Sequence, residues 1–250
     1  MIYPDFLSVL KLDVCDSTNN YIRAHYEDFR HQFPVLVTSR KQTGGRGREN
    51  RQWFSPDKKG LYSSFGYYLK NRNNLNLLSL IAGIAIADTL AKIVGESFKI
   101  KWPNDVLYQG KKAAGILTET VISDDRIFCI SGMGINVNHR QDDFPEELRA
   151  SAISLRMAAG REFDIDTVNG TLAHIFFRWL DKLEMGQNKT IIRRVNRLSH
   201  FVRGETVYIR DGKGNVGGVF ERIGLDGGIV LTDPRGNRIT YYSGEIRISY

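Results

Sequence analysis

Glycine and arginine are interleaved in the segment KQTGGRGRENRQW (41–53), which is well suited to bind a phosphate or a carboxylate. Glycine leaves backbone N–H groups open to an anion, and an arginine guanidinium binds such groups through two parallel hydrogen bonds. The Walker pattern GxxxxGK(S/T) is absent, as is a GxGxxG that opens a helix. The sequence therefore predicts a phosphate-binding loop of another kind, with a disordered RG-rich nucleic-acid segment as the alternative. Its candidate side chains are Arg46, Arg48, Arg51 and Trp53, whose indole could stack on a purine.

A second polar group lies in KWPNDVLYQGKKAAGILTE (101–119). Asn104 and Asp105 could bind a nucleotide hydroxyl or Mg²⁺, and an Asx turn explains them equally well. Lys112 follows a predicted hairpin turn and precedes small or apolar residues, so it either points into a pocket or ends a solvated strand. Asn136 closes the strand-like run GMGIN within reach of a nucleotide, although glycine in a strand often marks only close packing.

The net charge of +7 over 250 residues is unevenly distributed. Windows 40–59, 99–112 and 189–213 carry +5, +3 and +5, so the rest of the chain is acidic at −6. This pattern favours local anion sites over a uniform electrostatic coat for nucleic acid. Window 189–213 is also explained by a solvated helix and strand.

The composition excludes several classes of protein. With 42% hydrophobic and 25% charged residues, the chain is expected to be globular. Two cysteines, Cys15 and Cys129, exclude a disulfide-rich scaffold and a four-cysteine zinc site. We expect no signal peptide and no membrane span, and hence a cytoplasmic protein.

The hydrophobic pattern predicts an α+β catalytic region at residues 1–199 and a small β-domain at 200–250. We expect strands at 8–14, 35–39, 61–69, 98–102 and 126–138 and after Lys112. We expect helices from residue 17 to about 30 and at 75–95, 145–150, 154–159, 166–185 and 188–199, with a long loop at 41–60. From residue 203 onward, turns at 211–212, 226–227 and 235–237 separate short strands, which predicts a small barrel.

Four motifs together resemble those of the biotin–protein ligases. They are CDSTNNY (15–21), Gln42 with GGRGRENRQW (44–53), the 101–119 segment and GMGINVN (132–138). Their order and spacing also match, and the resemblance extends over nearly the whole chain. It implies a mixed sheet flanked by helices, like that of class II synthetases and biotin ligases, followed by an SH3-like β-barrel.

The resemblance implies a two-step, ATP-dependent reaction. Biotin carboxylate attacks the α-phosphorus of ATP, and a lysine of a biotin carboxyl carrier protein then attacks the resulting biotinyl-5′-AMP. A carboxylate is ionised at pH 7, so the first step needs positive charge, including Mg²⁺ carried with ATP, and no general base. The second step needs a deprotonated amine, which Asp105 would orient or help to deprotonate.

The resemblance also assigns roles to individual residues. The biotin-binding positions are Ser17, Thr18, Asn19, Gln42, Arg46, Gly47, Arg48, Lys112 and Gly115. The ATP-binding positions are Arg48, Arg51, Trp53, Asn104, Lys112 and Asn136, and the catalytic group is Arg46, Arg48, Asp105 and Lys112.

The chain departs from the family pattern at three points. It begins at the catalytic strand, so no N-terminal winged helix, no operator DNA and no repressor role are expected. Glu49 and Asn50 stand where several relatives have basic or small residues, which changes the expected retention of the adenylate. Gly44 replaces a residue that is often larger, so we expect a loop that is more mobile when empty.

Three alternative functions are also compatible with the sequence. A lipoate–protein ligase or octanoyltransferase has the same fold, and the transferase needs a cysteine nucleophile, whereas Cys15 and Cys129 lie in strand-like runs. A nucleic-acid-binding module would use the RG loop and the 189–213 stretch, and a scaffold protein would keep the fold without activity. The family includes monomers and homodimers.

Overall fold

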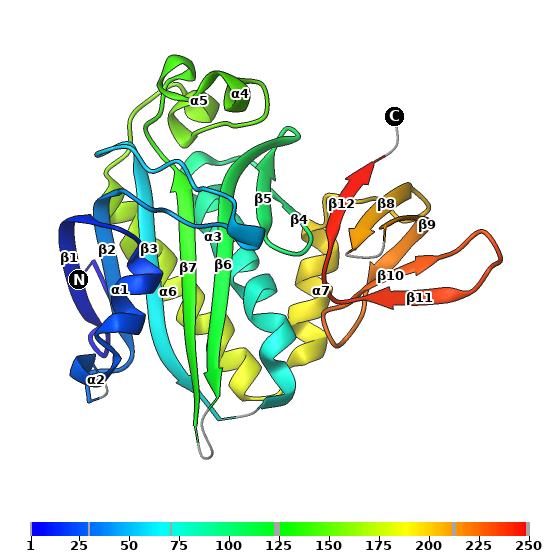
Figure 1. The fold of residues 1–250 in the computed structure, drawn as a ribbon, viewed down its shortest axis with the longest axis horizontal. Coiled ribbons are helices and arrows are strands. Elements are labelled where there is room, and N and C mark those ends of the chain that lie inside the picture. The colour runs from blue at the N-terminus through cyan, green and yellow to red at the C-terminus, as the bar shows by residue number, and fades with distance from the viewer. Residues whose placement is uncertain (1, 30, 71, 123–125, 212–213, 249–250) are drawn as a thin grey trace.

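The computed structural model describes residues 2–29, 31–70, 72–122, 126–211 and 214–248. Its main feature is a seven-stranded mixed sheet in the order β1-β2-β3-β7-β6-β5-β4 (Figure 1). Only the β1–β2 pair is parallel within it. The strands are β1 (Ser8–Cys15), β2 (Val35–Gln42), β3 (Gly60–Leu69), β4 (Lys99–Lys101), β5 (Asp105–Tyr108), β6 (Lys111–Ile122) and β7 (Ile127–Asn136). The predicted mixed sheet is confirmed.

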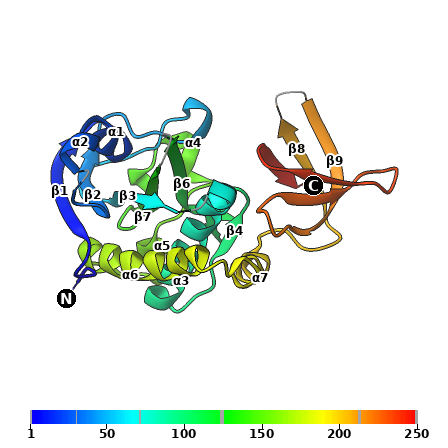
Figure 2. The ribbon, with the colours of Figure 1, turned by 90° about the horizontal axis from the view of Figure 1, so that it is seen from below.

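Helices cover both faces of this sheet unequally. One face packs against the long helices α3 (Leu78–Val94) and α6 (Ile165–Glu184), with α7 (Asn188–Leu198) beside them (Figure 2). The other face carries the short α1 (Thr18–Ala24) and α2 (Tyr26–Phe29) and the 43–59 loop (Figure 1). Because these elements are short, they leave part of this face of the sheet open to a ligand. The remaining short helices are α4 (Glu146–Arg149), α5 (Leu155–Ala159) and the 3-10 turns Arg48–Asn50, Arg72–Leu77 and Gln141–Asp143.

Helix α3 forms the apolar centre of the molecule. The stretch Leu75–Val94 is long and apolar enough to cross a membrane, with a mean hydropathy of 2.0, but 67% of its most apolar 18-residue window is buried inside the protein. Ile81, Ile84 and Leu90 are fully buried, as in the core helix of a globular domain. Gly95 ends the helix with a φ of 84°, a left-handed conformation that glycine adopts without strain.

A second, antiparallel sheet forms the C-terminal part, in the order β11-β10-β9-β8-β12. Its topology is consistent with the SH3-like domain that the sequence predicts. It packs against the first part, since the Trp102 indole N–H donates to the Gly227 carbonyl at 2.9 Å. A division at residue 200 itself stays a prediction. The strands are β8 (Thr206–Asp211), β9 (Gly214–Ile223), β10 (Ile229–Thr232), β11 (Arg238–Tyr241) and β12 (Glu245–Ile248).

The expected helix from residue 17 to about 30 is wrong as a single element. His25 leaves the helical conformation, with φ −106° and ψ 24°, and its ring stacks on Tyr21 at 4.1 Å. The chain therefore forms α1 and α2 with a break between them, and Arg30 lies outside the described residues. Turns at 226–227 and 235–237 are confirmed by the positive φ of Gly227 and Gly236, whereas the turn at 211–212 involves an undescribed residue.

Candidate active site

One cavity of about 320 Å³ opens on the sheet face that carries α1 and the 43–59 loop. All fourteen site residues predicted from the sequence line it, although they come from segments spread over residues 17–136. They are Ser17, Thr18, Asn19, Gln42, Arg46, Gly47, Arg48, Arg51, Trp53, Asn104, Asp105, Lys112, Gly115 and Asn136. The fold thus brings these fourteen residues together around one cavity.

Glycines on β6 and β7 form the floor of the cavity. Gly115 and Gly134 face each other across the two strands, and the Trp53 indole lies directly on them. A Cβ at Gly134 would come within 2.4 Å of Trp53 Nε1, and one at Gly115 within 2.8 Å of the same ring. Because such distances are below van der Waals contact, the close approach of the ring requires glycine at both positions.

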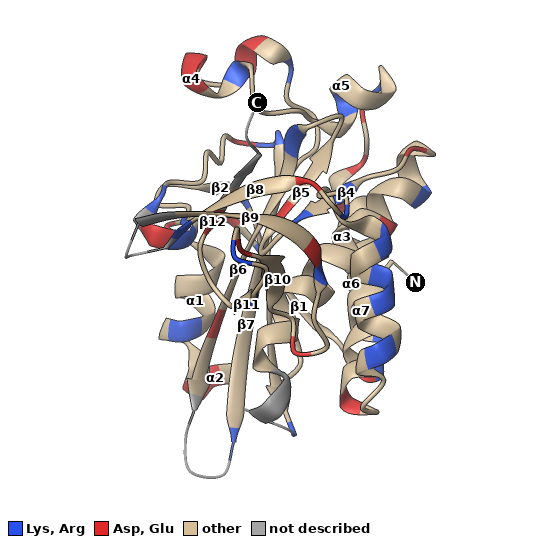
Figure 3. Ribbon diagram, turned by 90° about the vertical axis from the view of Figure 1, so that its right-hand side faces the viewer, with Lys and Arg blue, Asp and Glu red and all other residues tan. Residues whose placement is uncertain are grey.

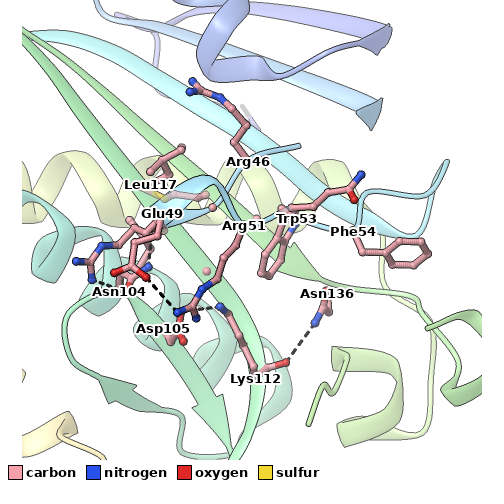
Figure 4. Close-up of a pocket in the computed structure, with 18 of the residues that line it drawn as sticks. Arg46, Glu49, Arg51, Trp53, Phe54, Asn104, Asp105, Lys112, Leu117 and Asn136 are labelled. Atoms are coloured by element: carbon pink, nitrogen blue, oxygen red, sulfur yellow. Dashed lines mark hydrogen bonds and ion pairs between the residues drawn. The ribbon is translucent and has the colours of Figure 1, made fainter. Parts of the chain in front are cut away.

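Positive charge gathers at one end of the cavity, hereafter the cationic end (Figure 4). Lys112 Nζ lies 2.7 Å from Asp105 Oδ1 and 5.3 Å from the centre of the Trp53 ring. Arg48 Nη1 donates to Asn104 Oδ1 at 3.4 Å, and Asn104 Nδ2 donates to the Ile116 carbonyl at 3.1 Å. Such an end can bind phosphate or carboxylate oxygen atoms and stabilise negative charge on them.

Neutral hydrogen-bonding groups line the opposite end, hereafter the polar end. Gln42 Oε1 accepts from the Thr18 backbone N–H at 2.9 Å, so the first turn of α1 is held by a side chain of β2. Gln42 Nε2 donates to Ser55 Oγ at 3.0 Å. Ser17 and Thr18 are 3% and 4% exposed, so a small polar ligand bound here would be largely desolvated. Ser17 takes the N-cap position of α1 without a side-chain hydrogen bond.

Asn136 also lies where the sequence predicts, at the end of β7. Its Nδ2 donates to the backbone carbonyls of Lys112 and Ile153, both at 3.2 Å. The amide therefore joins the start of β6 to the segment that follows α4. These two hydrogen bonds fix the backbone at Lys112.

Ion pairs hold the loop over the cavity at two places. Arg46 Nη2 lies 3.2 Å from Glu119 Oε2 of β6, and in Figure 4 Arg46 extends away from Lys112 and Asp105. Arg51 Nη2 lies 2.9 Å from Glu245 Oε2 of β12, which raises the pKa of the Arg51 guanidinium above its ordinary value. The second contact ties the loop to the C-terminal sheet.

Four residues in or beside the cavity were not among the predicted site residues: Glu119, Gly132, Gly134 and Glu245. Glu119 closes the 101–119 motif, and strand alternation would have placed it on the same face as Gly115 and Leu117. Gly132 and Gly134 lie in the GMGIN run, where the same alternation applies. Nothing in the sequence links Glu245 to a loop about two hundred residues earlier.

The third basic window does not contribute to the cavity over its described residues, 189–211, because none of them lines it. Both cysteines are also outside the cavity lining. Burial raises the pKa of the Cys129 thiol to about 12 and also raises that of Cys15, so both stay protonated at neutral pH. Neither thiol has the low pKa expected of a nucleophile.

The model of the biotin/lipoate A/B protein ligase family matches residues 12–138. These residues contain all fourteen of the predicted site positions, and the match covers half of the chain. The chain therefore belongs to the biotin/lipoate A/B protein ligase family. Its mixed sheet and second antiparallel sheet agree with the solved structures of biotin protein ligases.

Relatives with assigned names support this membership. The bifunctional ligase/repressor BirA of Bacillus subtilis is 43% identical over 136 residues, which covers 52% of this chain and 41% of that protein. This chain thus spans about two fifths of the length of that relative. BirA of Escherichia coli is 30% identical over 230 residues, which covers 90% of this chain and 69% of the relative.

A shorter relative and a solved structure match over most of their length. The biotin–[acetyl-CoA-carboxylase] ligase of Paracoccus denitrificans is 31% identical over 216 residues, covering 81% of this chain and 86% of that protein. The biotin protein ligase of Aquifex aeolicus, solved in complex with biotin and ATP, superposes with a TM-score of 0.83. It is 29% identical, and the match covers 97% of this chain and 99% of that one.

Proposed function

We propose that this protein is an ATP-dependent ligase that activates biotin as biotinyl-5′-AMP and transfers it to one lysine of a biotin carboxyl carrier domain. The observation that carries the proposal is the union of a cationic end and a polar end in one cavity on a glycine floor. A molecule with a carboxylate at one end and a neutral, hydrogen-bonding ring at the other fits this division of charge. Biotin has both features.

In the first step, a biotin carboxylate oxygen attacks the α-phosphorus of ATP, the α–β anhydride bond breaks and pyrophosphate leaves. Arg48 and Lys112 would bring the two anions together and stabilise the negative charge that develops on the phosphoryl oxygens. Trp53 and Asn104 would bind on the nucleotide side. Mg²⁺ would accompany the phosphates, and Asp105 is a carboxylate of the cationic end that would hold it.

In the second step, a carrier lysine amine attacks the acyl carbon, a C–N bond forms, and AMP leaves as the C–O bond breaks. The attacking amine must first lose a proton, because the reference pKa of lysine is about 10.4. Asp105 would orient this amine and take up its proton. The ion pair of this carboxylate with the Lys112 ammonium, at 2.7 Å, supports the proposed role.

We also propose a cytoplasmic location, because ATP is plentiful there and the two cysteines are free thiols, Cys129 buried and Cys15 partly buried. The partner would be the carrier domain of acetyl-CoA carboxylase or of another biotin-dependent carboxylase. The reaction as proposed does not depend on whether the protein is a monomer or a homodimer.

The test is to incubate the purified protein with biotin, ATP, Mg²⁺ and a carrier domain, and to measure the mass of the carrier. We expect one biotinyl addition on one lysine, and none on a carrier with that lysine changed to arginine. Replacing biotin by lipoate should abolish the addition. No addition with biotin, or an equal addition with lipoate, would contradict the proposal.

A further inference from the structure

Glu119 of β6 links the sheet to α1 and to the 43–59 loop at the polar end, although it is not among the site residues predicted from the sequence. Its carboxylate accepts from Asn19 Nδ2 at 2.8 Å and pairs with Arg23 Nη2 at 2.7 Å, both on α1. It also pairs with Arg46 Nη2 of the loop at 3.2 Å. The Glu119 side chain is 19% exposed, so these contacts are partly shielded from solvent.

The contacts of Glu119 fix the orientation of the Asn19 amide. The amide Nδ2 carries two protons, and they go to Glu119 and to the Leu117 carbonyl at 3.2 Å. A carboxylate and a carbonyl only accept hydrogen bonds, so Nδ2 must face them. Asn19 Oδ1 then faces Ser64 Oγ at 2.6 Å.

The fixed amide in turn sets the direction of the next hydrogen bonds. Ser64 carries one hydroxyl proton, and Asn19 Oδ1 can only accept, so that proton goes to Asn19. Ser64 Oγ also lies 2.6 Å from Thr18 Oγ1, and Thr18 Oγ1 lies 3.2 Å from Gln42 Oε1, which can only accept. Because the Ser64 proton goes to Asn19, the one Thr18 proton goes to Ser64 or to Gln42. Thr18 therefore has no proton left to give, and toward the cavity that it lines it can only accept.

We propose that Glu119 is a positioning residue that sets the donor and acceptor pattern of the polar end and so determines selectivity for a cyclic urea. A urea ring presents N–H donors, which need an acceptor such as Thr18 Oγ1, and one carbonyl acceptor. Glu119 acts on the ligand through Asn19 and Ser64, and it holds Arg46 above the same end. This inference rests on the proposed function, because it assumes that biotin binds there.

The experiment compares biotin with 2-iminobiotin in ATP–pyrophosphate exchange by the wild type, Glu119→Gln and a matched control. 2-Iminobiotin replaces the urea carbonyl by an N–H donor and so needs a different pattern of partners. The control is Glu221→Gln on β9, where Glu221 binds Thr232 at 2.6 Å and Arg238 at 3.0 Å, outside the cavity. Thermal unfolding of each variant reports folding.

For Glu119→Gln we expect KM for biotin to rise about tenfold, as for a lost hydrogen bond to a charged group, while KM for ATP stays within about twofold. The preference for biotin over 2-iminobiotin should fall by at least about threefold, because a glutamine amide can rotate and donate where the carboxylate only accepts. Glu221→Gln should match the wild type in both respects.

Unchanged selectivity and KM in a folded Glu119→Gln variant would overturn the inference and leave the proposed function intact. Wild-type protein without biotin-dependent exchange would instead refute the proposed function. If Glu119→Gln does not fold, Glu119→Asp keeps the charge but withdraws it by one methylene. Because the shorter carboxylate holds the Asn19 amide less closely, selectivity should fall by less than in Glu119→Gln, and wild-type selectivity in this variant would likewise overturn the inference.

Discussion

The basic residues of the cavity and those of α7 come from windows of similar net charge, but they lie in different surroundings. Arg46, Arg48, Arg51 and Lys112 come from two windows of the chain and line one concave site. On α7, Lys189, Arg193 and Arg197 recur every four residues and are exposed, and Figure 3 shows basic residues along this helix. Two windows of similar net charge therefore contribute to a cavity in one place and to a solvated helix face in the other.

The difference follows from what surrounds each charge. Arg48 and Lys112 lie against partly buried partners, Asn104 and the Trp53 ring, so water screens them less and they act more strongly on a bound anion. On α7, Arg194 is the cation with a structural contact, because it binds Asp88 of α3 beside the core. Net charge alone therefore did not identify the site, whereas spacing and glycine content did.

Among the basic residues compared here, removing Lys112 should have the largest effect on activity. Lys112→Ala deletes the amine that would neutralise both reacting anions, and we expect biotin-dependent ATP–pyrophosphate exchange to fall by about a thousandfold or more. Lys111→Ala is the matched control, since Lys111 begins the same strand but does not line the cavity. Similar exchange rates in the two variants would refute the assignment of Lys112.

Removing Arg48 should release the adenylate. Arg48→Ala loses the contact with Asn104 and a cation over the phosphates, so biotinyl-5′-AMP should escape and label bystander proteins about tenfold more than wild type. The measurement is streptavidin blotting of an added protein that is not a carrier. Arg40→Ala serves as control, because Arg40 pairs with Asp13 and Asp57 outside the cavity. Strict carrier specificity in Arg48→Ala would contradict the role.

Breaking the contact between the loop and the C-terminal sheet should have a moderate effect. Arg51 and Glu245 are 59% and 25% exposed, so their ion pair contributes at most about 1 kcal/mol. Arg51→Gln should raise KM for ATP by about fivefold or less and speed proteolysis of the 43–59 loop. In wild type, biotin plus ATP should protect the loop, and equal cleavage with and without these ligands would show that it does not order on binding.

Neutralising the three exposed cations of α7 should have the smallest effect. Changing Lys189, Arg193 and Arg197 together to glutamine should leave exchange and carrier modification within about twofold of wild type, as for exposed charges in general. The alternative of a nucleic-acid module predicts instead a salt-dependent RNA or DNA affinity that this triple variant loses. A large loss of carrier modification alone would mean that α7 meets the carrier.

Much of the fold and site could be predicted, because local patterns carry them. The strands, the long helices and the polar loop follow from apolar spacing, and the Gly-Arg interleaving and Lys112 mark the anion site. What the sequence could not show depends on distant pairings. The Arg51–Glu245 contact joins segments 194 residues apart, and the direction of Asn19 depends on Glu119, which is 100 residues away. The break at His25 is too small a feature for periodicity to detect.

The most direct test of the central claim is ATP–pyrophosphate exchange with purified protein, Mg²⁺ and either biotin or lipoate. We expect exchange with biotin and none with lipoate or without an acid. Exchange should be retained in Lys111→Ala and lost in Lys112→Ala. Exchange that is independent of biotin, or that lipoate supports equally well, would contradict the central claim.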